Sequence, residues 1–232
     1  MLNDNNTNLT ASPSISTHDC YLPEYDVMQS LAVESKPEVI RHEERQTITA
    51  KGKTETLVVN LFAGPGAGKS TTAAGVFFEL KTRGINCEIA AEFAKDLTWE
   101  ERHRTFTDQI YIFGKQYHRI FRLLGQVAVI ITDSPLLLTP VYDLEKRATL
   151  EKLVLEEHNK MWTYNAFLKR KKPFNPKGRI HGEEHAKDID YAVAEMLFKH
   201  EIPFETFDGT TDGKDAIVKK ILMLLEWKEK SE

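Results

Sequence analysis

Hydrophobic positions follow two alternating patterns along the chain from Thr56 onward. Short continuous apolar runs, typical of strands buried on both faces, alternate with segments in which apolar residues recur at helical spacing. These runs predict strands over 57–62, 86–91, 127–132, 162–168 and 203–207, and helices over 69–83, 98–124, 144–160, 183–200 and 213–228. Strands that alternate with helices indicate an α/β fold, here a three-layer domain around a five-stranded parallel sheet.

The longest predicted helix begins at Thr98, because Thr98 and Glu101 match the spacing of a capping box. Apolar side chains then recur at helical spacing as far as Leu124, and Gly125 ends the segment. Gln109, Gln116, Arg119 and Arg122 lie in this stretch and could present polar groups to a substrate. A solvated helix face explains the same pattern equally well.

The first part of the chain has a different composition. Residues 1–22 contain hardly any large apolar side chains, which predicts a disordered tail. Residues 23–55 mix scattered apolar side chains with many charges, and they could form short helices that dock on the domain or a partner-binding arm. The folded domain is therefore expected to span 56–230.

A glycine-rich turn separates the first predicted strand from the first predicted helix. The sequence AGPGAGKS over 63–70 follows the GxxxxGK[ST] phosphate-binding pattern, except that Ala63 replaces its first glycine. Backbone N–H groups and a helix N-terminus at such a turn bind phosphate. The predicted nucleotide-binding residues are Gly64, Pro65, Gly66, Ala67, Gly68, Lys69, Ser70 and Thr71. Lys69 is expected to reach the β- and γ-phosphates of ATP, and the Ser70 hydroxyl to ligate Mg²⁺.

Two carboxylates follow the next strands. Glu92 ends the second predicted strand and Asp133 the third, at the sheet edge where parallel α/β proteins bind ligands. Glu92 is a candidate general base for an attacking hydroxyl. Asp133 could hold Mg²⁺ together with Ser70, or orient the nucleophile. A solvated strand end and a turn cap are the alternative interpretations of these two residues.

A basic stretch with two prolines follows the fourth predicted strand. P-loop kinases carry a lid at this position, whose arginines close over the transferring phosphoryl group. The lid is expected over about 169–182, with Arg170 binding the nucleotide and Arg179 taking part in catalysis. A solvated charged loop would have the same composition.

The composition and charge of the chain limit the classes of binding partner and the cellular location that we expect. The formal net charge of −4 does not favour broad nucleic-acid binding, although a local basic groove remains compatible with it. The sequence contains neither an apolar run long enough for a membrane span nor a secretory signal. Cys20 and Cys87 are not expected to pair, so a reducing cytoplasm is the predicted location.

Five segments together resemble a P-loop nucleoside/nucleotide-kinase-like ATPase family of phage and bacteria. They are AGPGAGKST (63–71), EFAKD (92–96), QIYIFGKQYHR (109–119), ITDSPLLL (131–138) and KPFNPKGRIHGEEHAKDID (172–190). The chain is similar in outline to the ribosylnicotinamide kinase domain of the bifunctional NAD-biosynthesis regulator. This resemblance implies acidic roles for Glu92 and Asp133 and a lid role for Arg179.

These features favour a kinase that uses ATP and Mg²⁺ to phosphorylate a nucleoside or a nucleotide. A hydroxyl acceptor would use a carboxylate base, whereas a phosphate acceptor would need several arginines. A kinase of a modified base in DNA ranks lower because of the net charge. An ATPase switch acting on a protein or nucleic acid is the alternative class, although no Glu follows Asp133 to polarise water.

Overall fold

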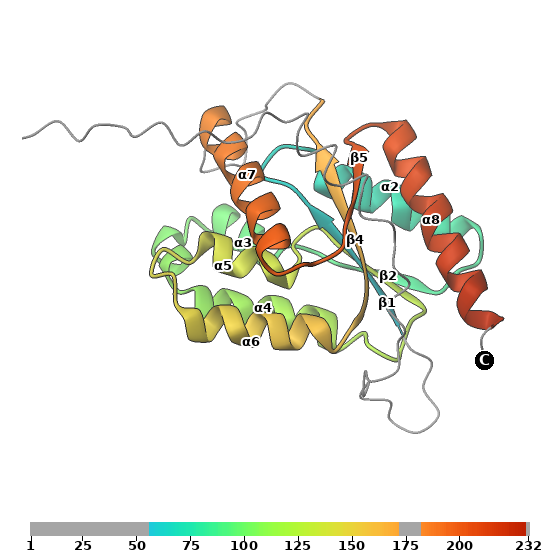
Figure 1. The fold of residues 1–232 in the computed structure, drawn as a ribbon, viewed down its shortest axis with the longest axis horizontal. Coiled ribbons are helices and arrows are strands. Elements are labelled where there is room, and N and C mark those ends of the chain that lie inside the picture. The colour runs from blue at the N-terminus through green and yellow to red at the C-terminus, as the bar shows by residue number, and fades with distance from the viewer. Residues whose placement is uncertain (1–55, 172–181, 231–232) are drawn as a thin grey trace, which may run out of the picture. The chain divides into compact units, whose positions relative to one another are not determined.

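The computed structural model describes residues 56–171 and 182–230, which form a five-stranded parallel sheet with helices on both faces (Figure 1). The strands are β1 (Leu57–Phe62), β2 (Cys87–Ala90), β3 (Val129–Thr132), β4 (Trp162–Lys169) and β5 (Glu205–Asp208). Their order in the sheet is β2-β3-β1-β4-β5, and every neighbouring pair is parallel. The predicted α/β three-layer fold with a five-stranded parallel sheet is confirmed.

Two groups of helices cover the sheet. On one side lie α2 (Lys69–Thr82) and α8 (Thr211–Glu229), which pack against each other. The other side carries α3 (Phe93–Trp99), α4 (Gln109–Phe121), α5 (Thr139–Tyr142), α6 (Ala148–Asn159) and α7 (Glu183–Lys199), with 3₁₀ turns at η1 (His103–Thr107) and η2 (Leu136–Leu138). The sheet is therefore the middle of three layers. Because all five strands are parallel, their carboxyl ends lie along the same edge of the sheet.

The central strand β1 is buried along its whole length. It pairs with β3 on one side and β4 on the other, and the side chain of Asn60 donates a hydrogen bond of 2.9 Å to Asn165 opposite it on β4. From β1 the chain crosses to β2, and from β3 it crosses back to β4, so the direction of winding reverses between β1 and β3. Ligands of open parallel sheets bind at such a reversal.

The predicted long helix over 98–124 is wrong. Thr98 lies inside α3, where its hydroxyl donates to the carbonyl oxygen of Ala94, and α3 ends before Glu101, whose φ of 54° is left-handed. A new helix, α4, begins after Asp108, whose carboxylate accepts a 3.1 Å hydrogen bond from the Tyr111 N–H. An aspartate cap satisfies a free helix donor, so Asp108 starts the helix at a place that the apolar periodicity does not mark.

Some predictions fall outside the described residues. The tail over 1–22, the arm over 23–55 and most of the predicted lid lie there, including Arg179. Within the described ranges, no helix is both long and apolar enough to cross a membrane.

Candidate active site

The turn between β1 and α2 has the backbone geometry of a phosphate-binding loop. Gly66 and Gly68 have φ angles of 84° and 105°, which residues with a Cβ rarely adopt, and helix α2 begins at Lys69 immediately after them. The first amides of α2 therefore point toward the loop and could bind an anion.

Lys69 connects the end of this loop to its beginning. Its Nζ donates hydrogen bonds of 2.7 Å to the carbonyl oxygen of Ala63 and 3.0 Å to that of Gly64. Burial lowers the pKa of Lys69, while the carboxylates of Glu92, Asp133 and Asp190 act in the opposite direction. The ammonium group thus lies in a partly desolvated site where an anionic ligand would be bound strongly.

The two predicted carboxylates lie together at the carboxyl ends of β2 and β3. The backbone N–H of Glu92, at the start of α3, donates a 3.1 Å hydrogen bond to Oδ1 of the buried Asp133. Burial raises the pKa of Glu92, and the nearby Asp133 carboxylate adds to this effect, whereas Lys69 opposes it. A raised pKa suits a carboxylate that accepts a proton near neutral pH.

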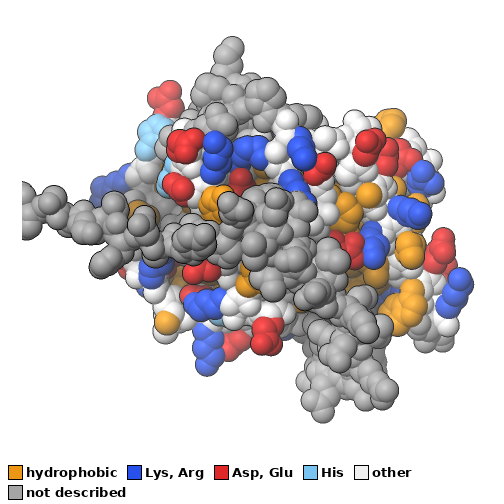
Figure 2. Space-filling view, turned by 45° about the horizontal axis from the view of Figure 1, so that its top comes forward, with side chains coloured by type: hydrophobic (Ala, Val, Ile, Leu, Met, Phe, Trp, Pro, Cys, Tyr) orange, Lys and Arg blue, Asp and Glu red, His pale blue; other side chains and the backbone are white. Residues whose placement is uncertain are grey.

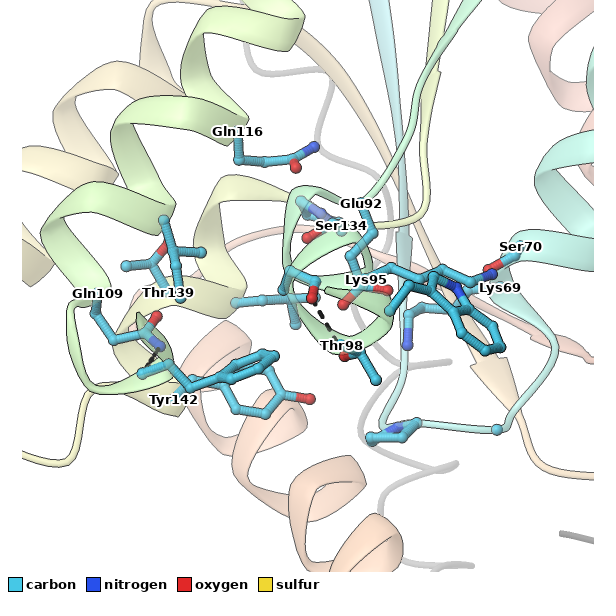
Figure 3. Close-up of a pocket in the computed structure, with 18 of the residues that line it drawn as sticks. Lys69, Ser70, Glu92, Lys95, Thr98, Gln109, Gln116, Ser134, Thr139 and Tyr142 are labelled. Atoms are coloured by element: carbon cyan, nitrogen blue, oxygen red, sulfur yellow. Dashed lines mark hydrogen bonds between the residues drawn. The ribbon is translucent and has the colours of Figure 1, made fainter. Parts of the chain in front are cut away.

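A cavity of about 370 Å³ extends from the phosphate-binding loop to the helices on the other side of the sheet. Figure 3 shows Lys69 and Ser70 at one end, Gln109, Thr139 and Tyr142 at the other, and Glu92 between them. The lining residues from the loop and α2 are Pro65, Gly66, Gly68, Lys69, Ser70 and Thr71. The remaining lining residues come from four further segments: Glu92, Ala94, Lys95, Thr98, Trp99, Phe106, Gln109, Ile112, Gln116, Ser134, Pro135, Leu138, Thr139 and Tyr142.

The polar residues predicted along the long helix separate into two groups. Gln109 and Gln116 are buried and line the cavity. The Gln116 side chain also connects α4 to α3, because its carbonyl oxygen accepts a 2.9 Å hydrogen bond from the Phe93 N–H. Arg119 pairs instead with Asp96 and donates to the carbonyl oxygen of Ala91, and neither it nor the exposed Arg122 lines this cavity.

Arg170, the predicted nucleotide-binding residue of the lid, does not line the cavity. Its guanidinium donates hydrogen bonds of 2.8 Å to the Pro65 carbonyl oxygen and 2.9 Å to Asp190 on α7. The same aspartate accepts the Gly64 N–H through its other oxygen. Arg170 thus contacts the outside of the phosphate-binding loop, and its contact with a nucleotide stays a prediction.

The residues present fit Mg²⁺. Ser70 offers an exposed hydroxyl in the cavity lining, whereas the Asp133 carboxylate is buried behind the lining, where it accepts the Glu92 N–H. Hydroxyl and carboxylate oxygens are ligands that Mg²⁺ prefers alongside water and phosphates. Within the described ranges, no group of three or more His, Cys, Asp or Glu side chains could hold a metal ion by itself. A magnesium ion at this place would depend on nucleotide phosphates for much of its coordination.

Three residues of the site were not predicted from the sequence. Asp190 lies 126 residues after Gly64, which it contacts; Trp99 lies in a segment rich in charged residues, and Tyr142 follows an apolar run. Only Asp190 had a hint, since the segment resembling a kinase ended there. The Tyr142 hydroxyl has a raised pKa because of burial, with the carboxylates of Glu92 and Asp190 contributing.

The sheet order, the glycine-rich loop and the position of Lys69 define the fold as that of a P-loop NTPase. A solved structure, described as the NadR protein in complex with NAD and AMP-PNP, has a similar fold, with a TM-score of 0.54 and 15% sequence identity. The match covers 71% of this chain and 48% of that chain, so this chain spans about half of that protein's length. No protein-family model and no curated protein matches the sequence. The predicted likeness to the NAD-biosynthesis regulator is therefore supported at the level of fold.

Proposed function

We propose that the protein is a kinase that transfers the γ-phosphoryl group of ATP to a hydroxyl group of a small, uncharged acceptor, a nucleoside. The observation that carries this proposal is the single cavity that runs from the phosphate-binding loop past Glu92 to Gln109, Thr139 and Tyr142. The structural neighbour, a complex with NAD and AMP-PNP, supports nucleotide binding at this fold.

The cavity chemistry favours a nucleoside over a nucleotide. Among the described lining residues Lys69 and Lys95 are the cations, and no arginine is present. A phosphate on the acceptor would call for several arginines, because their paired donors match its geometry. Gln109, Thr139 and Tyr142 offer amide and hydroxyl groups instead, and Trp99 and Phe106 offer rings on which a base could stack.

The proposed reaction uses the raised pKa of Glu92. The carboxylate accepts the proton of the acceptor hydroxyl as that oxygen attacks the γ-phosphorus, and the bond from the γ-phosphorus to the bridging oxygen breaks so that ADP leaves. Lys69 stabilises the negative charge on the transferring group. Mg²⁺, when bound near Ser70, would neutralise charge on the β- and γ-phosphates.

A kinase of a modified base in DNA is the weaker proposal within this class. On the face in Figure 2, Lys and Arg side chains are interspersed with Asp and Glu, and the chain's net charge is −4. Binding to a duplex depends mainly on contacts between cationic side chains and phosphates. The mixed surface therefore supports a small acceptor.

The test is ATP consumption by the purified chain with a panel of nucleosides, their monophosphates, ribosylnicotinamide and short DNA. We expect one nucleoside-like compound to stimulate ADP release and to become phosphorylated, and Lys69→Ala to show neither effect. A preference for monophosphates would contradict the uncharged acceptor. ATP hydrolysis that no acceptor stimulates would favour an ATPase switch with a macromolecular partner.

A further inference from the structure

We infer that Arg170 and Asp190 form a positioning pair that holds the first residues of the phosphate-binding loop in their nucleotide-binding shape. The inference rests on the proposed binding of ATP but not on the identity of the acceptor. Neither side chain lines the cavity. They therefore act on nucleotide binding from outside the cavity, through the backbone of Gly64 and Pro65 and through their charges near Lys69.

Each member of the pair contacts this short piece of backbone, and the two side chains also bind each other. One carboxylate oxygen of Asp190 accepts the Gly64 N–H, and the other binds Nη2 of Arg170 at 2.9 Å. Nη1 of Arg170 donates to the Pro65 carbonyl oxygen at 2.8 Å, while Nη2 also lies 3.4 Å from the Ala186 carbonyl oxygen. Both charged side chains are largely buried, with 12% and 11% of their surfaces exposed.

Packing at Gly64 brings helix α7 directly against the loop. A Cβ atom added to Gly64 would lie 2.3 Å from the Ala186 carbonyl oxygen and 3.0 Å from Asp190 Oδ1. Real Cβ atoms do not approach backbone oxygens so closely, so a larger residue would displace either the loop or α7. The loop and the first turns of α7 are thus in contact at a position that only glycine fits.

The pair matters most when Lys69 binds a phosphate. Lys69 now donates to the carbonyl oxygens of Ala63 and Gly64, and these bonds weaken when its ammonium turns to a nucleotide. The Gly64 N–H and the Pro65 carbonyl then depend on Asp190 and Arg170 for their positions. Preorganised donors bind phosphate more tightly because less order is lost on binding.

The Arg170–Asp190 pair is not optimised for the stability of the fold, which is consistent with a positioning role. Nε of Arg170 is buried and has no hydrogen-bond partner among the described residues. An unsatisfied buried donor costs free energy of folding, and a buried ion pair is itself weak evidence for stability. The Arg170 guanidinium is thus oriented so that its two Nη groups bind Pro65 and Asp190, while its Nε–H is left without a partner among the described residues.

Graded variants of Asp190 test the inference. Asp190→Asn keeps an oxygen for the Gly64 N–H but removes the charge, whereas Asp190→Ala removes both. We expect the Kd for AMP-PNP, measured by titration calorimetry, to rise about tenfold in the alanine variant and less in the asparagine variant. The KM for ATP should rise in parallel, while the KM for the acceptor stays near its wild-type value.

Arg170→Lys is the conservative partner variant. Lysine keeps the charge but lacks the forked donors, so it can contact Asp190 or Pro65 and not both. We expect an increase in Kd between those of the two Asp190 variants. Gly64→Ala should weaken AMP-PNP binding as well, and Gly114→Ala is its matched control, because a Cβ on Gly114 meets no atom within 4 Å.

A measurement on the wild-type protein tests the inference even if the variants fail to fold. In labelled wild-type protein, the Gly64 amide proton should remain protected from exchange when AMP-PNP saturates the site. Loss of this protection on nucleotide binding would overturn the inference, as would folded variants with a lower Tm but an unchanged Kd. Failure of the wild type to bind AMP-PNP would instead contradict the proposed use of ATP.

Discussion

The two ends of the cavity are built in opposite ways. The nucleotide end comes from one continuous stretch, residues 63–71, whose amides, Lys69 and Ser70 lie together because they are neighbours in sequence. The acceptor end is assembled from α3, η1, α4 and the segment from Ser134 to Tyr142. The first end has a recognisable sequence motif for this reason, and the second has none.

The two ends of the cavity are also stabilised in different ways. The loop is held by charged and polar contacts from outside the cavity, at Arg170 and Asp190. The acceptor end is held by its own lining residues, as Gln116 shows by bonding to Phe93 while facing the cavity. Changes to the acceptor lining should therefore affect substrate binding and local structure together.

Removal of the Lys69 ammonium should produce the largest loss. We expect Lys69→Ala to lower kcat by about 10²–10³-fold, since it removes a charge that stabilises the transferring phosphoryl group. Steady-state ADP release measures this effect. Lys81→Ala is the matched control, because Lys81 lies in the last turn of the same helix and pairs with Glu88 at the surface. Equal losses in both variants would contradict a specific role for Lys69.

Glu92 lies where the two ends of the cavity meet. If it is the base, Glu92→Gln should lower kcat by about 10²-fold while leaving the Kd for AMP-PNP nearly unchanged. The backbone contact from residue 92 to Asp133 persists in this variant, so the fold should be retained. Loss of nucleotide binding together with transfer would exclude Glu92 as the base.

The pH dependence gives a second test of Glu92. Because burial raises its pKa, the carboxylate becomes protonated at a higher pH than an ordinary glutamate, which titrates at about 4.3. A base must be deprotonated to act, so kcat/KM should fall as the pH drops, with a midpoint above that value. An acid limb at the ordinary glutamate pKa would contradict this environment.

Trp99 should affect the acceptor end alone. It lines the cavity with 68% of its surface exposed, and stacking of a base on such a ring contributes about 1–3 kcal/mol. We expect Trp99→Ala to raise the acceptor KM by about tenfold with little change in the KM for ATP. Trp227→Ala on α8 is the control, since Trp227 is 52% exposed and does not line the cavity. A similar increase in the control would contradict stacking at Trp99.

The smallest effect on activity is expected at Asp143, which follows Tyr142 at the end of α5 and does not line the cavity. Its buried carboxylate accepts hydrogen bonds from the backbone and side chain of Arg147, and these bonds hold its pKa below the usual range. Asp143→Asn should lower the Tm by about 2–4 °C at neutral pH.

The pH dependence of this contribution has a defined sign. A lowered folded-state pKa means that the stabilisation is complete above the pKa of the unfolded chain, about 3.9, and is lost as the pH falls below it. The difference in Tm between wild type and Asp143→Asn should therefore shrink in acid. A difference that stays constant down to the lowest measurable pH would show that the charge of Asp143 contributes nothing.

Local sequence patterns predicted much of the fold. All five strands were predicted with bounds within two residues of those observed. The nearly continuous apolar runs at β1 and β3 match strands that are buried along their whole length, whereas β2 and β5 are short and only partly buried. The prediction of one long helix over 98–124 was wrong because apolar periodicity indicates which face of a helix is buried but not where the backbone leaves the helical conformation. The left-handed residue Glu101 and the cap at Asp108 divided it into α3, η1 and α4.

The sequence by itself determined the phosphate-binding loop, since its function depends on adjacent amides, two glycines with positive φ and one lysine. It also placed Glu92 and Asp133 at strand ends. Only the tertiary structure decided that α7 delivers Asp190 to Gly64, that Arg170 contacts the loop, and that Trp99 and Tyr142 face one cavity. Those contacts join residues far apart along the chain, and they form only when the helices pack on the sheet.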